Sequence, residues 1–241
     1  RALAEYLDSG LYHSRAMALK KWFNAPTGLD GLLEVLRNGH RTAPELFVYK
    51  EPFLSLAPEF VFDALPDAQV VYIYRDGRDV ANSLVCSYDV LTDEKLTHLR
   101  SSEMRLGRPY DHRYVPWWVE ENRDEAFIES PPYVRAIWMW KYMVRRCHDA
   151  FAERARARPD QVLQIRYEAF MAHPHATGRA LLEHVGAAPN RAFDRRLAQA
   201  HTDSIGKYRR RDPEEVAAAE AVARDELALH GYLHPEPHEV S

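Results

Sequence analysis

The fold predicted for this chain is decided by one stretch, Val70-Val71-Tyr72-Ile73-Tyr74-Arg75-Asp76-Gly77-Arg78-Asp79-Val80-Ala81-Asn82-Ser83-Leu84. Its first five residues are an unbroken run of β-branched and aromatic side chains, which is typical of a strand buried on both faces of a parallel sheet. The polar residues that follow turn the chain. Asp76 is placed to cap a helix, and Asp79 lies three residues later in a capping-box position. The stretch therefore predicts a strand, a tight turn and a helix.

This arrangement favours anion binding. It places free backbone N–H groups of a helix N-terminus at the carboxyl edge of a sheet, where anions bind readily. Arg75, at the end of the strand, adds a guanidinium group, and the hydroxyl of Ser83 in the helix can turn toward the same anion. The alternative is that the Asp and Arg side chains of the turn only pair with one another around a capped helix.

Residues 74–83 resemble the 3′-phosphate-binding motif of sulfotransferases that use 3′-phosphoadenosine 5′-phosphosulfate (PAPS). In that family an Arg and a Ser eight residues later hold the 3′-phosphate, and Arg75 and Ser83 have this separation. Gly77 stands where the family usually has Pro. The resemblance implies an α/β fold of the P-loop-NTPase-like sulfotransferase type, with a central parallel sheet flanked by helices. It also implies PAPS as the sulfuryl donor.

Size and composition are compatible with this class. The chain has 241 residues, 46% hydrophobic and 28% charged, and we expect residues 1–241 to form a single domain. A net charge of −4 argues against nucleic-acid binding, and no apolar run reaches the length of a membrane span. The two Cys residues lack the spacing of a zinc site or a disulfide framework. We therefore expect a cytoplasmic protein without a metal.

A second family feature, a Gly-rich phosphate loop after the first strand, is not found in the sequence. In the family a helix follows that loop at once, and residues 1–7 have the pattern of a helix already in progress. The ten Gly residues are scattered and form no such loop. We expect the first strand and the phosphate loop to precede this sequence. The alternative is that the protein has no such loop.

Apolar periodicity and punctuation by Gly and Pro predict the remaining elements. Strands are expected at 45–49 and 161–167, and helices at 29–36, 58–65, 133–157, 177–185 and from 212 to about 231. Residues 87–131 form an insert, with a polar helix over 91–104 and an aromatic segment that contains Trp117 and Trp118. We expect this insert to cap the sheet edge and to suit an aromatic or apolar acceptor. Alternatively, the two Trp residues only anchor the loop to the core.

Three further residues complete the predicted nucleotide site by resemblance. Tyr167, with Glu168 after it, resembles the family's Tyr-Glu-Asp segment, in which Tyr contacts the adenine side of the nucleotide. We interpret Glu168 as a structural cap. The basic stretch 204–210 resembles the family's late Gly-x-Trp segment, with Tyr208 in the Trp position. On that match Ser204 and Lys207 complete the 3′-phosphate pocket; the alternative is a solvated basic loop.

The predicted catalytic residues are Lys50 and Glu51. The family places a Lys after the corresponding strand to meet the bridging or sulfuryl oxygens, and Lys50 has that position. The family's usual bases are absent, since Pro52 and Tyr49 stand in their places, so Glu51 is the nearest carboxylate. The alternative is that Glu51 only accepts hydrogen bonds from backbone groups at the end of the strand. His40, His98 and His112 are further candidates.

The sequence thus predicts a sulfotransferase that moves a sulfuryl group from PAPS to a hydroxyl or amine of a small organic acceptor. Two alternatives stay open. One is a P-loop-type nucleotide-dependent kinase, which would need a carboxylate for Mg²⁺. The other is a non-catalytic module that binds 3′-phosphonucleotides. The sequence does not predict the oligomeric state or the acceptor.

Overall fold

The computed structural model describes residues 48, 50–98 and 107–233. The chain divides into two compact units, the first made of residues 1–54 and 59–68 and the second of residues 55–58 and 69–241. The predicted helices at 1–7 and 29–36 lie outside the described residues, as does most of the predicted strand at 45–49. The prediction of one domain therefore stays a prediction.

The described part of the first unit contains the helix predicted over 58–65. This helix is α4 (Glu59–Ala64), and its Phe62 is buried. A short 3₁₀ helix, η1 (Pro52–Leu56), precedes α4 in the chain. The sequence pattern therefore located α4 to within a residue at each end.

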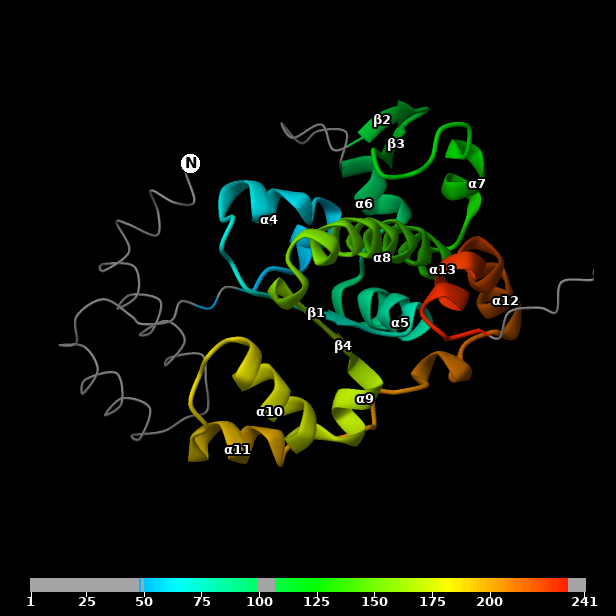
Figure 1. Cartoon of the computed structure of the whole chain (residues 1–241). Helices are drawn as coiled ribbons and strands as arrows, with labels where there is room; N and C mark the ends of the chain where they lie inside the picture. Colours follow the sequence, from blue (N-terminus) through cyan, green and yellow to red (C-terminus); the bar gives the residue numbers. More distant parts are fainter. Residues whose placement is uncertain (1–47, 49, 99–106, 234–241) are drawn as a thin grey trace, which may run out of the picture. The chain divides into compact units, whose positions relative to one another are not determined.

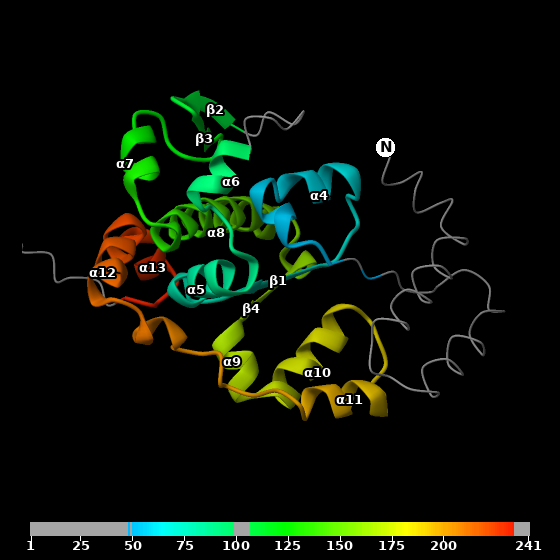
Figure 2. The same cartoon turned by 180° about the vertical axis from the view of Figure 1, so that it is seen from behind.

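The second unit contains a small parallel sheet of two strands within the described ranges. Strand β1 (Val70–Tyr74) pairs with β4 (Val162–Arg166), in a register that runs from Val70 opposite Val162 to Tyr74 opposite Arg166 (Figure 2). Both strands were predicted and both are confirmed. The full burial predicted for β1 is wrong, because Ile73 is 46% exposed in a strand whose described pairing is on one edge only. The molecule is mixed α/β and mostly helical.

Helix α5 (Gly77–Tyr88) begins directly after the β1 turn, as predicted, and packs along α8 (Pro132–Ala157) (Figure 1). The Asp76 carboxylate caps α5 by accepting the Arg78 backbone N–H at 3.0 Å. At Gly77 a Cβ atom would lie 2.4–2.7 Å from ring atoms of Trp140. Gly77 therefore permits the close approach of α5 to α8.

Helix α8 lies at the centre of the hydrophobic core of the second unit. The helix predicted at 133–157 is confirmed, and its apolar side is buried at Trp140, Val144 and Cys147, while Met143 is half-buried. Helix α12 (Pro213–Val222) also packs on α8. The core thus forms around one long amphipathic helix that the 3.6-residue periodicity predicted.

The insert at 87–131 differs in part from the prediction. Its described elements are α6 (Asp93–His98), a hairpin of β2 (Gly107–Tyr110) and β3 (Arg113–Pro116), and α7 (Asp124–Glu129). The predicted helix over 91–104 is described only at 93–98. Trp118 is 8% exposed and makes an edge-to-face contact with Phe127, so it anchors the insert in the core, whereas Trp117 is 46% exposed.

Apart from β4, the elements described between residues 159 and 233 are short helices. They are η2 (Pro159–Gln161), α9 (Tyr167–Ala172), α10 (Pro174–His184), α11 (Arg191–Leu197), η3 (Lys207–Arg210), α12 and α13 (Arg224–Leu229). The single last helix predicted from residue 212 is wrong, because Ala223 leaves the helical conformation (φ −118°, ψ 26°) where it is fully buried in the core. Among the described residues, no helix is both long and apolar enough to span a membrane.

Candidate functional site

Arg75 lies at the carboxyl end of β1 and contacts two other segments of the chain. Its Nη2 donates a hydrogen bond to the backbone oxygen of Ser204, and its guanidinium lies 4.7 Å from the centroid of the Tyr167 ring. Its side chain is 19% exposed. Within the described part of the molecule its buried Nε has no partner. The guanidinium has five N–H donors, so the contact to Ser204 leaves donors of Arg75 for a ligand, among them the Nε–H.

Tyr167 and Ser204 complete a three-residue cluster with Arg75. The hydroxyl groups of Tyr167 and Ser204 are hydrogen-bonded at 3.0 Å. The parallel pairing of β1 and β4 explains why Tyr167 lies close to Arg75. Tyr74 lies opposite Arg166, so the residues that follow them, Arg75 and Tyr167, both leave the sheet at the same edge. Three residues predicted from separate motifs therefore contact one another.

Asp79 joins this cluster to the loop before η3. It is 2% exposed, and its carboxylate accepts the backbone N–H of Gly206 at 2.6 Å and of Tyr208 at 3.1 Å. It also lies 3.5 Å from Nη2 of Arg75. The predicted capping-box role of Asp79 is therefore wrong, because its side chain turns to the backbone donors of another segment.

In a capping box a second carboxylate accepts the backbone N–H of the N-cap residue, here Asp76, and in this protein Glu168 supplies that carboxylate. Its Oε1 accepts the Asp76 backbone N–H at 3.0 Å, so a side chain 92 residues away replaces Asp79 in that role. The interpretation of Glu168 as a cap agrees with this contact. Neither role is readable from local spacing, because the partners are distant in sequence.

Lys207 and Ser83 were also predicted to hold the 3′-phosphate, but within the described residues neither makes a hydrogen bond to Arg75. Lys207 is exposed and sits between the two residues whose N–H groups bind Asp79. Ser83 is half-buried and lies one turn after Asp79 on the same face of α5. Lys207 lines a cavity of about 550 Å³, together with Asn82, Cys86, Arg210, Arg211 and Asp212. The three cations of this cavity suit an anionic group.

Arg78 has a structural role. Its buried guanidinium binds the Asp76 carboxylate at 2.7 Å and Glu220 at 2.6 Å, and lies 4.4 Å from the centroid of the Tyr208 ring. Burial opposes its charge, but the hydrogen bonds and charge attraction to Asp76, together with the hydrogen bond to Glu220, exceed the effect of burial in sum and raise the pKa of Arg78. The alternative interpretation, in which the Asp and Arg side chains of the turn only pair with one another, therefore holds for Arg78 and Asp76. Arg75, in contrast, also contacts Tyr167 and Ser204.

The predicted catalytic residues, Lys50 and Glu51, belong to the first unit. Lys50 is exposed. Glu51 is half-buried, and its Oε1 accepts the Phe53 backbone N–H at 3.0 Å, which caps η1. Their catalytic roles stay predictions. Of the His candidates, His112 is exposed in the turn of the β2–β3 hairpin, while His40 and the side chain of His98 lie outside the described residues.

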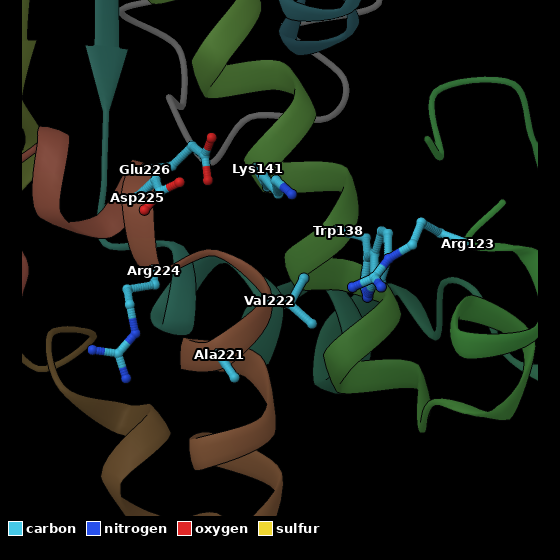
Figure 3. Close-up of a pocket in the computed structure, with 8 residues that line it drawn as sticks. All are labelled: Arg123, Trp138, Lys141, Ala221, Val222, Arg224, Asp225 and Glu226. Atoms are coloured by element: carbon cyan, nitrogen blue, oxygen red, sulfur yellow. The ribbon is translucent and has the colours of Figure 1, made fainter. Parts of the chain in front are cut away.

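A second cavity, of about 280 Å³, lies between α8 and the α12–α13 segment (Figure 3). Figure 3 shows Trp138 and Lys141 on α8, with Val222 and Glu226 across from them. None of the predicted site residues lines this cavity. Within the described ranges, no group of three or more His, Cys, Asp or Glu side chains is arranged to hold a metal ion.

Comparison with known proteins supplies one match. Residues 125–190 match the family model described as "Sulfotransferase family". The matched segment contains α8, β4 and Tyr167, and it excludes Arg75, Ser83, Ser204 and Lys207. No curated protein matches the chain. The match confirms the resemblance to sulfotransferases from a segment other than the Arg75 motif.

Proposed function

We propose that this chain, whose residues 125–190 match the sulfotransferase family, transfers a sulfuryl group from PAPS to a hydroxyl or amine of a small organic acceptor. The observation that carries the proposal is the contact among Arg75, Tyr167 and Ser204 at the carboxyl edge of the sheet. These are the residues that the sulfotransferase motifs assign to the 3′-phosphoadenosine group, and they come from three separate stretches of sequence.

The residues around this cluster fit a phosphate group. Arg75 offers its unpartnered Nε, and the neighbouring cavity adds the cations of Lys207 and Arg210. In our proposal Arg75, Ser83, Ser204 and Lys207 hold the 3′-phosphate, and Tyr167 lies against the adenosine. A phosphate bound there would also compete with Asp79 for the Arg75 guanidinium.

The proposed reaction breaks the bond between sulfur and the bridging oxygen of PAPS and forms a bond from sulfur to the acceptor oxygen or nitrogen. The acceptor proton passes to a base, and 3′-phosphoadenosine 5′-phosphate (PAP) leaves. Positioning and electrostatic stabilisation supply most of the rate in such transfers. In our proposal Lys50 stabilises the charge that develops on the transferring group, and Glu51 is the base that accepts the acceptor proton.

Titration calorimetry of the protein with PAP, and with ADP in the presence and absence of Mg²⁺, tests the nucleotide assignment. We expect PAP to bind without metal. Arg75→Ala should weaken PAP binding by about 2 kcal/mol, roughly thirtyfold, because a charge-assisted contact is lost. Arg195→Ala, at an exposed position on α11, is the matched control and should leave the affinity unchanged. Equal PAP affinity in the Arg75 variant would overturn the site.

Transfer of labelled sulfur from PAPS to a panel of phenols, alcohols and amines tests the reaction. A labelled product on any acceptor supports the proposal. Preference for ADP with Mg²⁺ in the titration favours a kinase. Tight PAP binding with no transfer to any acceptor favours a non-catalytic binding module.

A further inference from the structure

Glu168 connects three segments that are far apart in the sequence. It lies in the first turn of α9, and its side chain is 18% exposed. Oε1 accepts the Asp76 backbone N–H at 3.0 Å, and Oε2 accepts the Tyr232 hydroxyl at 2.9 Å. Arg166 adds a longer contact to Oε2 at 3.4 Å. One carboxylate thus links the β1–α5 turn, the start of α9 and the segment after α13.

The peptide group between Arg75 and Asp76 is held at both of its polar atoms. Its N–H, from Asp76, donates to Glu168, and its carbonyl oxygen, from Arg75, accepts the indole N–H of Trp140 at 3.2 Å. A peptide plane fixed at both ends cannot rotate without breaking one of the two bonds. Because this plane follows the Arg75 Cα, its orientation sets the direction in which the Arg75 side chain leaves the strand.

Tyr232 fixes the Glu168 carboxylate in turn. Besides the hydroxyl contact, its backbone oxygen accepts Nη2 of Arg78 at 3.1 Å, and the Arg166 guanidinium lies 4.3 Å from its ring centroid. Burial, reinforced by the negative charge of Glu168, raises the pKa of Tyr232, so its hydroxyl stays protonated as a donor. Tyr232 therefore restrains the carboxylate from one side while Asp76 binds it from the other.

We propose that Glu168, oriented by Tyr232, is a positioning residue that aims Arg75 at the 3′-phosphate of the bound nucleotide. This inference rests on the proposed function. In this role neither residue contacts the nucleotide. Loss of Glu168 should therefore weaken the binding of 3′-phosphorylated nucleotides and leave the affinity for nucleotides that lack this group unchanged.

The variants Glu168→Gln and Tyr232→Phe test this role by calorimetry with PAP and with 5′-AMP. The readout is the ratio of the two dissociation constants, which a general loss of stability does not change. We expect Glu168→Gln to lower the preference for PAP about tenfold and Tyr232→Phe about threefold, the scale of a misplaced charge-assisted contact. The double variant should match Glu168→Gln alone, because Tyr232 acts through Glu168.

Glu120→Gln is the matched control, since it removes a carboxylate that pairs with Lys141 at 2.6 Å and has no part in the site. It should leave the ratio unchanged. A folded Glu168→Gln protein with the wild-type ratio would overturn the positioning role. Tyr232→Phe keeps the ring that Arg166 covers, so it carries the same test alone if Glu168→Gln does not fold.

Hydrogen exchange at the Asp76 amide separates this inference from the proposed function. We expect Glu168→Gln to speed exchange of that amide in the ligand-free protein, because the amide loses its charged acceptor. Unchanged exchange would overturn the positioning role whatever the nucleotide. If the wild-type protein does not prefer PAP to 5′-AMP, the proposed nucleotide is wrong, and the proposed consequence for 3′-phosphate binding is overturned with it.

Discussion

His230, the residue after α13, shows how strongly a single side chain is governed by its surroundings. Its ring lies 4.9 Å from the ring of Tyr74 and 6.0 Å from that of His148, measured between centroids. Burial, followed by the nearby His148, Arg145 and Arg166, lowers the pKa of His230 from its ordinary 6.5 to about 4. The imidazole is therefore uncharged in the folded protein at neutral pH.

This shift predicts a loss of stability in mild acid. Between pH 6.5 and about 4 the unfolded chain binds a proton at His230 and the folded chain does not, so the free energy of unfolding falls as the pH falls. We expect a contribution on the order of 1–2 kcal/mol, reduced from the full shift by solvent screening. Urea unfolding at pH 7.5 and 4.5 measures it.

The variant His230→Phe keeps a ring against Tyr74 and removes the titrating group. It should lose less stability than the wild type between the two pH values. His112→Phe, at an exposed hairpin turn, is the control and should behave as the wild type does. Identical pH dependence in wild type and His230→Phe would contradict the assignment.

At the scale of elements, Asp79 joins α5 to η3. Its carboxylate accepts two backbone N–H groups of the loop that carries Lys207, and both would lose their acceptor in Asp79→Ala. We expect that variant to lose about 2–4 kcal/mol of unfolding free energy, because buried donors are left unpaired. Trypsin should also cleave faster after the basic residues of 207–211.

Denaturant unfolding and mass spectrometry of timed digests check this prediction. Asp79→Asn keeps a carbonyl oxygen as acceptor and should lie between the wild type and Asp79→Ala. Asp194→Ala removes an exposed carboxylate on α11 and serves as the control. Cleavage at 207–211 at the wild-type rate in Asp79→Ala would show that the loop is held by other contacts.

At the scale of the whole molecule, nucleotide binding should appear as added thermal stability. The chain carries a net charge of −4, yet the proposed site gathers cations locally, so binding depends on the site rather than on overall charge. At a concentration of PAP one hundred times its dissociation constant, linkage adds about 2.7 kcal/mol of stability. For a chain of this size that corresponds to a rise in Tm of about 5–10 °C.

Calorimetric scans with PAP, 5′-AMP and ADP with Mg²⁺ measure this effect. We expect the largest rise with PAP. In Arg75→Ala at the same PAP concentration, the thirtyfold weaker binding should reduce the added stability to about 0.9 kcal/mol, a rise in Tm of about 2–3 °C. A larger rise with ADP and Mg²⁺ than with PAP would count against the sulfotransferase proposal and support a kinase.

Elements that depend on a local sequence pattern could be predicted from the amino-acid sequence. An unbroken apolar run specifies β1, a 3.6-residue stripe specifies α8, and Asp76 caps α5 through a neighbour two residues away. The sequence also placed Arg75 and Tyr167 directly after parallel strands, which brings them to one sheet edge. The β2–β3 hairpin was missed because its four-residue strands, which include Pro109 and Pro116, lack a clear alternation of polar and apolar residues.

The contacts that hold the site together depend on the folded arrangement of distant segments. Asp79 binds backbone donors 127 and 129 residues away, and Glu168 binds the Asp76 N–H across 92 residues. A carboxylate has the same local pattern whether it caps its own helix or binds another segment. The choice depends on which unpaired donor lies within reach once the chain has folded, and sequence spacing does not contain that distance.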